Sequence, residues 1–172
     1  FAMLLTGCGG GNQGSAEGSQ AAAIGQGVAE AESCIKIGVS GTPDLDPAIV
    51  NTGSSLIAAI NIYDTLIFPS NEADEGVIPR VAEDWTISED GLTYTFNLKK
   101  GIKFHNGDEL TASDVVYSMD RLLTIGEGYA YIFTSYVEPG TTVAVDDYTV
   151  EFHLKQAYGP FINALVRLYI LN

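Results

Sequence analysis

The stretch from residue 80 to residue 121 constrains the fold most, because consecutive local patterns in it agree with one another. Over Thr93–Lys99, apolar residues alternate with polar ones, which is the period of a strand with one buried face. Just before this strand, Asp90-Gly91 supplies the positive φ angle that a tight chain reversal needs. We therefore expect a β-hairpin over residues 84–99 with one face in the core.

A second turn and a helix start follow in the same stretch. The turn is expected at Asn106–Asp108, where Asn, Gly and Asp all favour a reversal. At Thr111, the hydroxyl can accept a hydrogen bond from the third helical N–H while Asp114 reaches back, as in a capping box. Apolar residues then recur at helical spacing: Val115, Val116, Met119, Leu122 and Leu123. These signals predict a helix with one apolar side.

Shorter patterns predict the remaining elements, and a chain of 172 residues is expected to form one domain. The expected elements are a strand at 35–40, a turn-rich loop at 41–47, a helix at 54–63, a short strand at 66–68, a polar loop at 71–76 and a helix at 159–168. The helix at 54–63 would place Leu56, Ile57, Ala59, Ile60 and Tyr63 on one side. Residues 129–137 are rich in aromatic side chains and fit either a helix or a strand. Together these elements predict an α/β fold.

An internal similarity between residues 85–99 and 143–155 predicts a second hairpin. In order, Asp90, Thr93, Phe96, Leu98 and Lys99 correspond to Asp147, Thr149, Phe152, Leu154 and Lys155. Two similar hairpins facing one core explain this similarity, with Val150, Phe152 and Leu154 pointing inward. Two copies are too few for a repeat architecture.

The ordered string from Ala82 to Ser118 is AEDW-x-x-S-x-DGLTYTF-x-L-x-x-G-x-KFH-x-G-x-x-LTA-x-DVVYS. It resembles the signature of the family 5 extracellular solute-binding proteins, the peptide- and nickel-binding subunits of bacterial ABC importers. Leu45-Asp46-Pro47 matches a further landmark of that family. The resemblance implies a periplasmic-binding-protein type II fold with a mixed sheet, helices, two lobes and a hinge. Residues 35–172 would then form an incomplete first lobe of the solute-binding domain.

The N-terminal residues predict a lipid anchor and a tether. Residues 1–8 resemble the end of a lipoprotein signal peptide, and the sequence around Cys8 matches the lipobox, in which that cysteine takes the diacylglycerol. The alternative is a free or buried cysteine in an apolar run. Residues 9–34 are rich in Gly, Ser and Ala without Lys or Arg, so they are expected to be a flexible tether. Acylation at two positions would give durable membrane attachment on the extracytoplasmic face.

Charge and motifs exclude several function classes. The chain carries 22 acidic against 8 basic residues, which disfavours nucleic-acid partners because these are bound through Lys and Arg contacts to phosphate. The sequence lacks G-x-S-x-G, H-E-x-x-H and P-loop motifs, so neither catalysis nor a cofactor is expected. His105, Asp108 and Glu109 have metal-ligating side chains, but a solvated turn is expected there, with His105 stabilising it by hydrogen bonding and no metal. Trp85 is expected in the core.

The resemblance also implies which residues contact a ligand. In peptide-binding relatives, a segment just after the Leu-Asp-Pro landmark lines the cleft, which here is Asn51, Thr52 and Gly53; these residues could equally cap the next helix. An aromatic residue after the signature helix can also face the cleft, with Tyr129 and Tyr131 as candidates. Ligand identity would depend on groups downstream of Asn172.

The function implied by the resemblance is that of a membrane-anchored, monomeric binding protein. It would capture oligopeptides or dipeptides outside the cytoplasm and deliver them to ABC permease subunits through closure of two lobes. One alternative within the family is a protein that binds nickel or another metal complex. The other is a ligand sensor without a role in transport.

Overall fold

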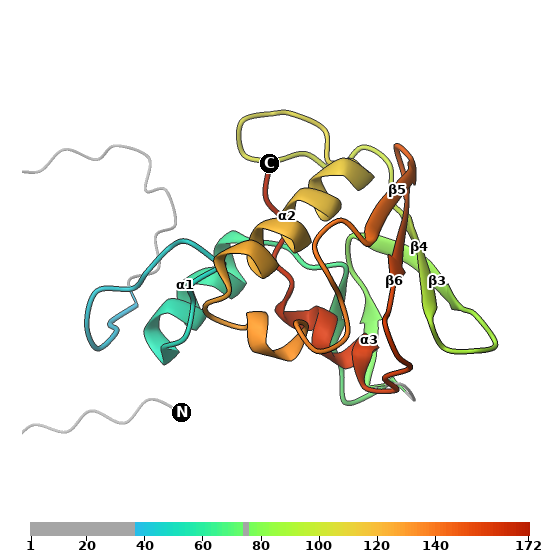
Figure 1. Ribbon diagram of the computed structural model, residues 1–172. Helices are drawn as coiled ribbons and strands as arrows, with labels where there is room; N and C mark the ends of the chain where they lie inside the picture. Colours follow the sequence, from blue (N-terminus) through green and yellow to red (C-terminus); the bar gives the residue numbers. More distant parts are fainter. Residues whose placement is uncertain (1–36, 74–75) are drawn as a thin grey trace, which may run out of the picture. The chain divides into compact units, whose positions relative to one another are not determined.

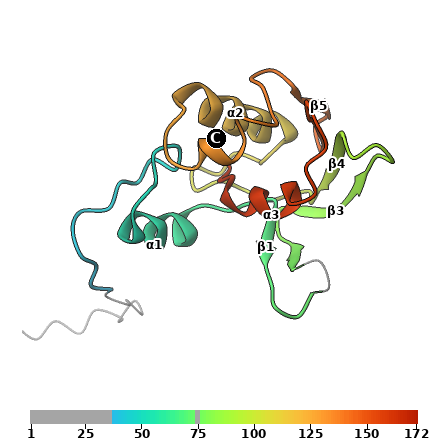
Figure 2. The same ribbon diagram turned by 60° about the horizontal axis from the view of Figure 1, so that its bottom comes forward.

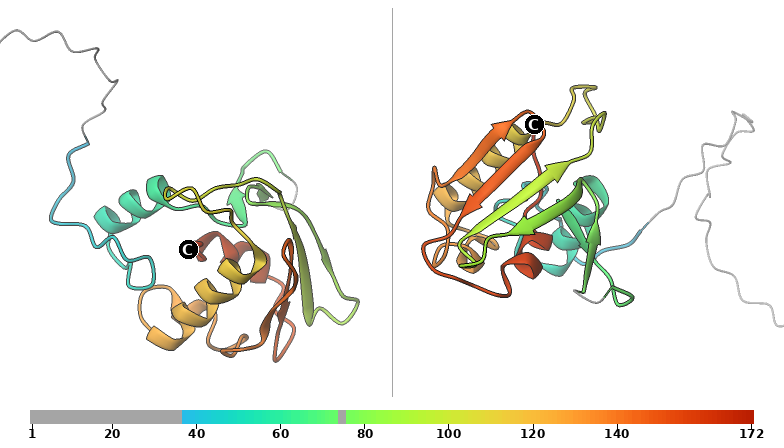
Figure 3. Two further views of the ribbon diagram at one scale, coloured as in Figure 1. Left: turned by 90° about the horizontal axis from the view of Figure 1, so that it is seen from above. Right: turned by 90° about the vertical axis from the view of Figure 1, so that its right-hand side faces the viewer.

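A four-stranded antiparallel sheet forms the main layer of the part of the chain that the computed structural model describes, which is residues 37–73 and 76–172. Its strand order is β3-β4-β6-β5, with β3 at Ala82–Ile87, β4 at Thr93–Leu98, β5 at Thr142–Asp146 and β6 at Thr149–His153 (Figure 1). Figure 3 shows this sheet face-on in its right panel, with helix α2 (Ala112–Ile125) behind it. Every strand pair in the described residues is antiparallel.

Both predicted hairpins are confirmed, and they meet along their second strands. β4 pairs with β6 so that Tyr94 lies opposite Phe152 and Phe96 lies opposite Val150. All four of these side chains are buried, and the rings of Phe96 and Phe152 meet edge to face with their centroids 5.7 Å apart. The internal similarity of the sequence therefore reflects two hairpins that supply the same face of one sheet.

Helix α2 covers the buried face of the sheet, as its apolar spacing predicts. Val115 and Met119 are fully buried against the strands. At its start, the Asp114 carboxylate accepts hydrogen bonds from the Thr111 N–H at 2.7 Å and from the Thr111 hydroxyl at 2.9 Å. These bonds satisfy an N–H group that lies outside the helical hydrogen-bond pattern and place a negative charge in the first turn, which favours a helix beginning here.

The remaining elements lie beside this two-layer unit. Helix α1 (Gly53–Ile62) precedes a two-stranded pair, β1 (Ile67–Pro69) and β2 (Val77–Pro79), which projects away from the larger sheet (Figure 2). After α2 come the 3₁₀ turn η1 (Ala130–Ile132), the short helix α3 (Phe161–Ala164) and the 3₁₀ turn η2 (Leu165–Arg167). Residues 129–137 thus resolve into turns and a 3₁₀ segment, and the helix expected at 159–168 is divided into two short pieces.

The strand expected at residues 35–40 is not formed in its described part. Residues 37–39 have no regular secondary structure, and Ile37 and Val39 are 63% and 39% exposed. A strand needs a neighbour for its backbone N–H and C=O groups, and the described residues offer none at this position. The predicted lipobox and tether at residues 1–34 lie outside the described residues. Among the residues described, no helix has both the length and the apolar character that crossing a membrane requires.

Candidate functional site

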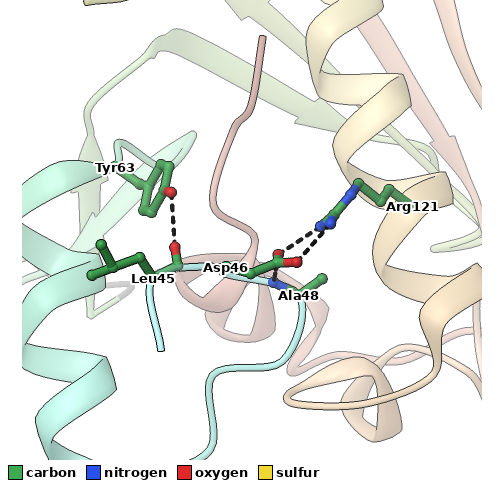
Figure 4. Close-up of polar contacts among 5 residues, drawn as sticks. All are labelled: Leu45, Asp46, Ala48, Tyr63 and Arg121. Atoms are coloured by element: carbon green, nitrogen blue, oxygen red, sulfur yellow. Dashed lines mark hydrogen bonds and ion pairs between the residues drawn. The ribbon is translucent and has the colours of Figure 1, made fainter. Parts of the chain in front are cut away.

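The loop that leads into α1 is held against α2 by a two-point ion pair. The Arg121 guanidinium of α2 donates to both carboxylate oxygens of Asp46, with N···O distances of 2.7 and 2.6 Å (Figure 4). On the other side of the loop, the Tyr63 hydroxyl donates to the carbonyl oxygen of Leu45 at 2.8 Å. The Leu-Asp-Pro landmark therefore bridges the end of α1 and the C-terminal half of α2.

The electrostatics of this contact favour the charged form of Asp46. Hydrogen bonds from Arg121 lower the pKa of the Asp46 carboxyl, opposed by partial burial and aided by the Ala48 N–H, which donates to the same carboxylate at 3.0 Å. Burial raises the pKa of the Tyr63 hydroxyl, so this group is a protonated donor at neutral pH. Both bonds to the loop therefore persist at neutral pH.

The next three residues along the chain are the candidate ligand segment, and the structure gives them different roles. Thr52 is the N-cap of α1: its hydroxyl oxygen accepts from the Ser55 N–H at 3.2 Å, and the two hydroxyl oxygens lie 2.8 Å apart. Asn51 and Gly53 are exposed and flank this cap. The capping interpretation thus accounts for the side chain of Thr52, while the surfaces of Asn51 and Gly53 stay accessible at the start of the helix.

A small apolar cluster brings the second candidate segment toward the first. Val50, Ala59 and Tyr169 are buried together, and Tyr129 packs against them from the turn after α2. Val50 immediately precedes the candidate segment, so Tyr129 and the start of α1 share one cluster. Tyr131 differs, since it is 70% exposed and its ring centroid lies 6.5 Å from that of Tyr129.

Arg167 belongs to the same neighbourhood and was not singled out from the sequence. Its guanidinium carbon lies 5.0 Å from the centroid of the Tyr129 ring, a cation–π distance. The ion pairs found among the described residues do not include Arg167. One signal could have identified it, because it is the only charged residue in the apolar run that ends the chain.

Two hollows adjoin these residues. One, of about 360 Å³, runs between α1 and η2 and is lined mainly by apolar side chains together with Arg80 and Arg167. The other, of about 600 Å³, lies between residues 38–44 and the first turn of α1, including Thr52 and Gly53. Two arginines line the first hollow, and Arg80 forms an ion pair with Asp64. Arg167 is therefore the arginine of this hollow that has no ion-pair partner among the described residues.

The signature turn around His105 lines a separate hollow of about 260 Å³, together with Tyr63, Asp64 and residues 170–172. Its hydrogen bonds come from the backbone and from Asn106 and Asp108, whose side chains bond each other at 2.7 Å, while the His105 side chain is exposed. The His105 side chain makes no hydrogen bond to the described residues, so its expected role in stabilising the turn is wrong; the side chains of Asn106 and Asp108 take that role. Glu109 points to the Tyr148 hydroxyl at 2.7 Å, and no cluster suited to a metal occurs among the described residues.

The expected core position of Trp85 is only partly met. Its side chain is partly buried and packs against the buried cluster, with its ring 5.9 Å from that of Phe96.

The chain matches known proteins over most of the described residues. The family described as "Bacterial extracellular solute-binding proteins, family 5 Middle" matches residues 76–171. The Escherichia coli dipeptide-binding protein is 36% identical over 141 residues, and the Pseudomonas aeruginosa di/tripeptide-binding protein 1 is 32% identical over 136 residues. These alignments cover 71% and 70% of this chain but 26% and 25% of the relatives, so the chain spans about a quarter of their length.

Solved structures agree with this assignment. The substrate-binding domain of an oligopeptide ABC transporter from Bacillus anthracis superposes with a TM-score of 0.63 at 30% identity, covering 74% of this chain and 27% of that one. The Helicobacter pylori protein DppA in complex with the peptide STSA gives a TM-score of 0.61 at 33% identity, covering 74% and 28%. The predicted fold is confirmed as part of the periplasmic-binding-protein type II fold, while the strands of the described residues pair only antiparallel and do not by themselves form the expected mixed sheet. Since the family match covers more than half of its residues, the chain belongs to family 5 of the bacterial extracellular solute-binding proteins.

Proposed function

We propose that the full-length protein is an extracytoplasmic lipoprotein that binds short peptides and presents them to an ABC permease. The observation that carries this proposal is the shared cluster of Val50, Ala59 and Tyr169. It gathers Tyr129, Arg167 and the exposed start of α1 on one side of the first lobe. Relatives named for dipeptides, di/tripeptides and glutathione support a short peptide as the ligand.

The chemistry of this neighbourhood suits a peptide. A peptide main chain lying in the cleft needs hydrogen-bonding partners from the protein. Asn51 and Gly53 are exposed, so their hydrogen-bonding groups are accessible to such a peptide. Tyr129 offers an aromatic face, and Arg167 offers a positive charge for a carboxylate. The second lobe, supplied by the rest of the protein, would close over the ligand as a hinged body.

Peptide binding is the first expected result for the full-length protein. Isothermal titration calorimetry should show trialanine binding with one-to-one stoichiometry, and Tyr129→Ala should weaken it about tenfold, which corresponds to about 1.4 kcal/mol. The substitution removes the aromatic face that would contact the peptide, and it removes the ring that packs against the Arg167 guanidinium. Tyr148→Ala is the matched control, because Tyr148 lies with Glu109 and Lys100, away from this cluster.

Two outcomes would contradict peptide binding. The first is a full-length protein that binds neither dialanine nor trialanine. The second is a protein that retains a nickel complex from its host and releases it to a chelator, which would favour the metal-binding branch of the family.

Membrane anchoring through Cys8 is the other part of the proposal, and it rests on the lipobox match. Intact-mass analysis of the mature protein from its host membrane should show a diacylglycerol-modified cysteine at the N-terminus. Replacing this residue in Cys8→Ser should release the protein from the membrane, because the thiol that forms the thioether is lost. Unchanged membrane attachment of Cys8→Ser would argue for a different anchor.

A further inference from the structure

We propose that Arg121 is a positioning residue of the ligand site, which holds residues 44–50 in the conformation that presents Asn51–Gly53. This inference rests on the proposed function, because positioning has a meaning only if that segment contacts a ligand. Arg121 itself lies on α2 and pairs with Asp46, five residues before Asn51. It would therefore act through the loop and make no direct contact with ligand.

The loop is fixed by side-chain contacts, since it contains no helix or strand of its own. The two-point pair with Arg121 fixes Asp46 in orientation as well as position. The Tyr63 hydroxyl holds the Leu45 carbonyl, and the Asp44 N–H donates to Ser55 Oγ at 2.9 Å. Three successive residues of the loop are thus tied to α1, its C-cap and α2. Figure 4 shows the contacts of Leu45 and Asp46.

A close backbone approach supports the same conclusion independently. Gly128, in the turn after α2, lies so near the loop that a Cβ atom there would be 2.7 Å from the Ala48 carbonyl oxygen. Ala48 and Val50 are both buried at this contact. Tyr129, the candidate aromatic contact, directly follows Gly128 in the sequence. The same turn therefore docks the loop and carries part of the proposed site.

Preorganisation explains why such an arrangement would matter for binding. If a loop becomes ordered only when the ligand binds, its loss of conformational entropy makes the binding free energy less favourable. A loop that is already fixed avoids this cost. Lysine could retain the charge at residue 121, but it lacks the planar fork that contacts both carboxylate oxygens. The proposal therefore requires the geometry of arginine as well as its positive charge.

The test compares affinity with stability in the full-length protein. Arg121→Gln and Asp46→Asn should each weaken trialanine binding about tenfold in calorimetry, the order expected for losing a charge-assisted contact. Arg121→Lys should resemble Arg121→Gln to within about threefold, because the two-point contact is lost in both. Amide hydrogen exchange over residues 45–53 should accelerate in all three variants.

Two control variants make the result decisive. Lys155→Gln removes the same charge from a surface pair, whose Lys155 Nζ lies 3.4 Å from Glu138, and should leave the affinity unchanged. Val150→Ala, in the sheet core, should lower the thermal midpoint without changing affinity. The proposal is overturned if Arg121→Gln keeps the wild-type affinity, or if Val150→Ala weakens binding as much. Failure of the wild-type protein to bind peptide would instead overturn the proposed function and this inference with it.

Discussion

Replacing Phe152 by alanine is expected to lower the free energy of unfolding by about 3–5 kcal/mol, the usual cost of removing a fully buried aromatic side chain. Phe152 is fully buried on β6. Its ring lies 5.7 Å from that of Phe96 in the neighbouring strand and 5.7 Å from that of Phe161 in α3. The substitution would therefore leave a cavity between α3 and the two central strands of the sheet, β4 and β6.

Urea-induced unfolding followed by circular dichroism would measure this loss. Val143→Ala is the matched control, because Val143 lies on β5 of the same sheet but is 42% exposed, and its change should stay within about 0.5 kcal/mol. A loss of 3–5 kcal/mol is a large part of the stability of an ordinary domain. Equal effects of the two substitutions would show that the aromatic cluster does not form the core.

The elements that could be predicted from the sequence are those whose signals are local. The hairpin over residues 84–99 follows from strand alternation and from the turn at Asp90, whose carboxylate accepts from the Ser88 hydroxyl and the Leu92 N–H. Helix α2 follows from apolar spacing and the contact between Thr111 and Asp114. In each case, the same few consecutive residues encode both the element and its boundary.

Elements that depend on a distant partner could not be predicted in this way. Residues 37–39 have strand-like alternation, yet an extended segment becomes a strand only beside another one. The predicted apolar side of α1 is likewise only partly covered, since Ile57 and Ile60 remain 42% and 44% exposed. Periodicity identifies which side chains can be buried together, but the available neighbours decide whether they are.

The candidate site shows the same limit. The family resemblance nominated Asn51–Gly53 and Tyr129 separately, and only the structure shows that they adjoin one cluster through Val50. The ion pair that fixes the loop joins Asp46 to Arg121, which are 75 residues apart in the sequence. No local sequence pattern around either residue indicates that the two are partners. Such contacts arise from the packing of α2 beside the loop, which local spacing does not encode.

The contact between this loop and the turn after α2 leads to the second large expected effect, in Gly128→Ala. Gly128 has a φ angle of +54°, a conformation that costs a residue with a Cβ atom about 1 kcal/mol. The new Cβ would also lie 2.7 Å from the Ala48 carbonyl oxygen, so the buried backbone of one segment must shift. We expect a total loss of about 2–4 kcal/mol in urea unfolding, the range of substitutions that combine strain with overpacking.

Gly140→Ala separates the two contributions to this loss. Gly140 has a φ angle of +82° but nothing within 4 Å of the position a Cβ would take, so its replacement should cost only the backbone term of about 1 kcal/mol. The loss of unfolding free energy should be larger in Gly128→Ala than in Gly140→Ala. Amide exchange over residues 45–53 should accelerate in Gly128→Ala alone. Equal losses for the two variants would mean that the loop yields freely to the added methyl group. A loop that yields so easily could not serve as the fixed wall of a binding site, because its conformation would then be set by the ligand.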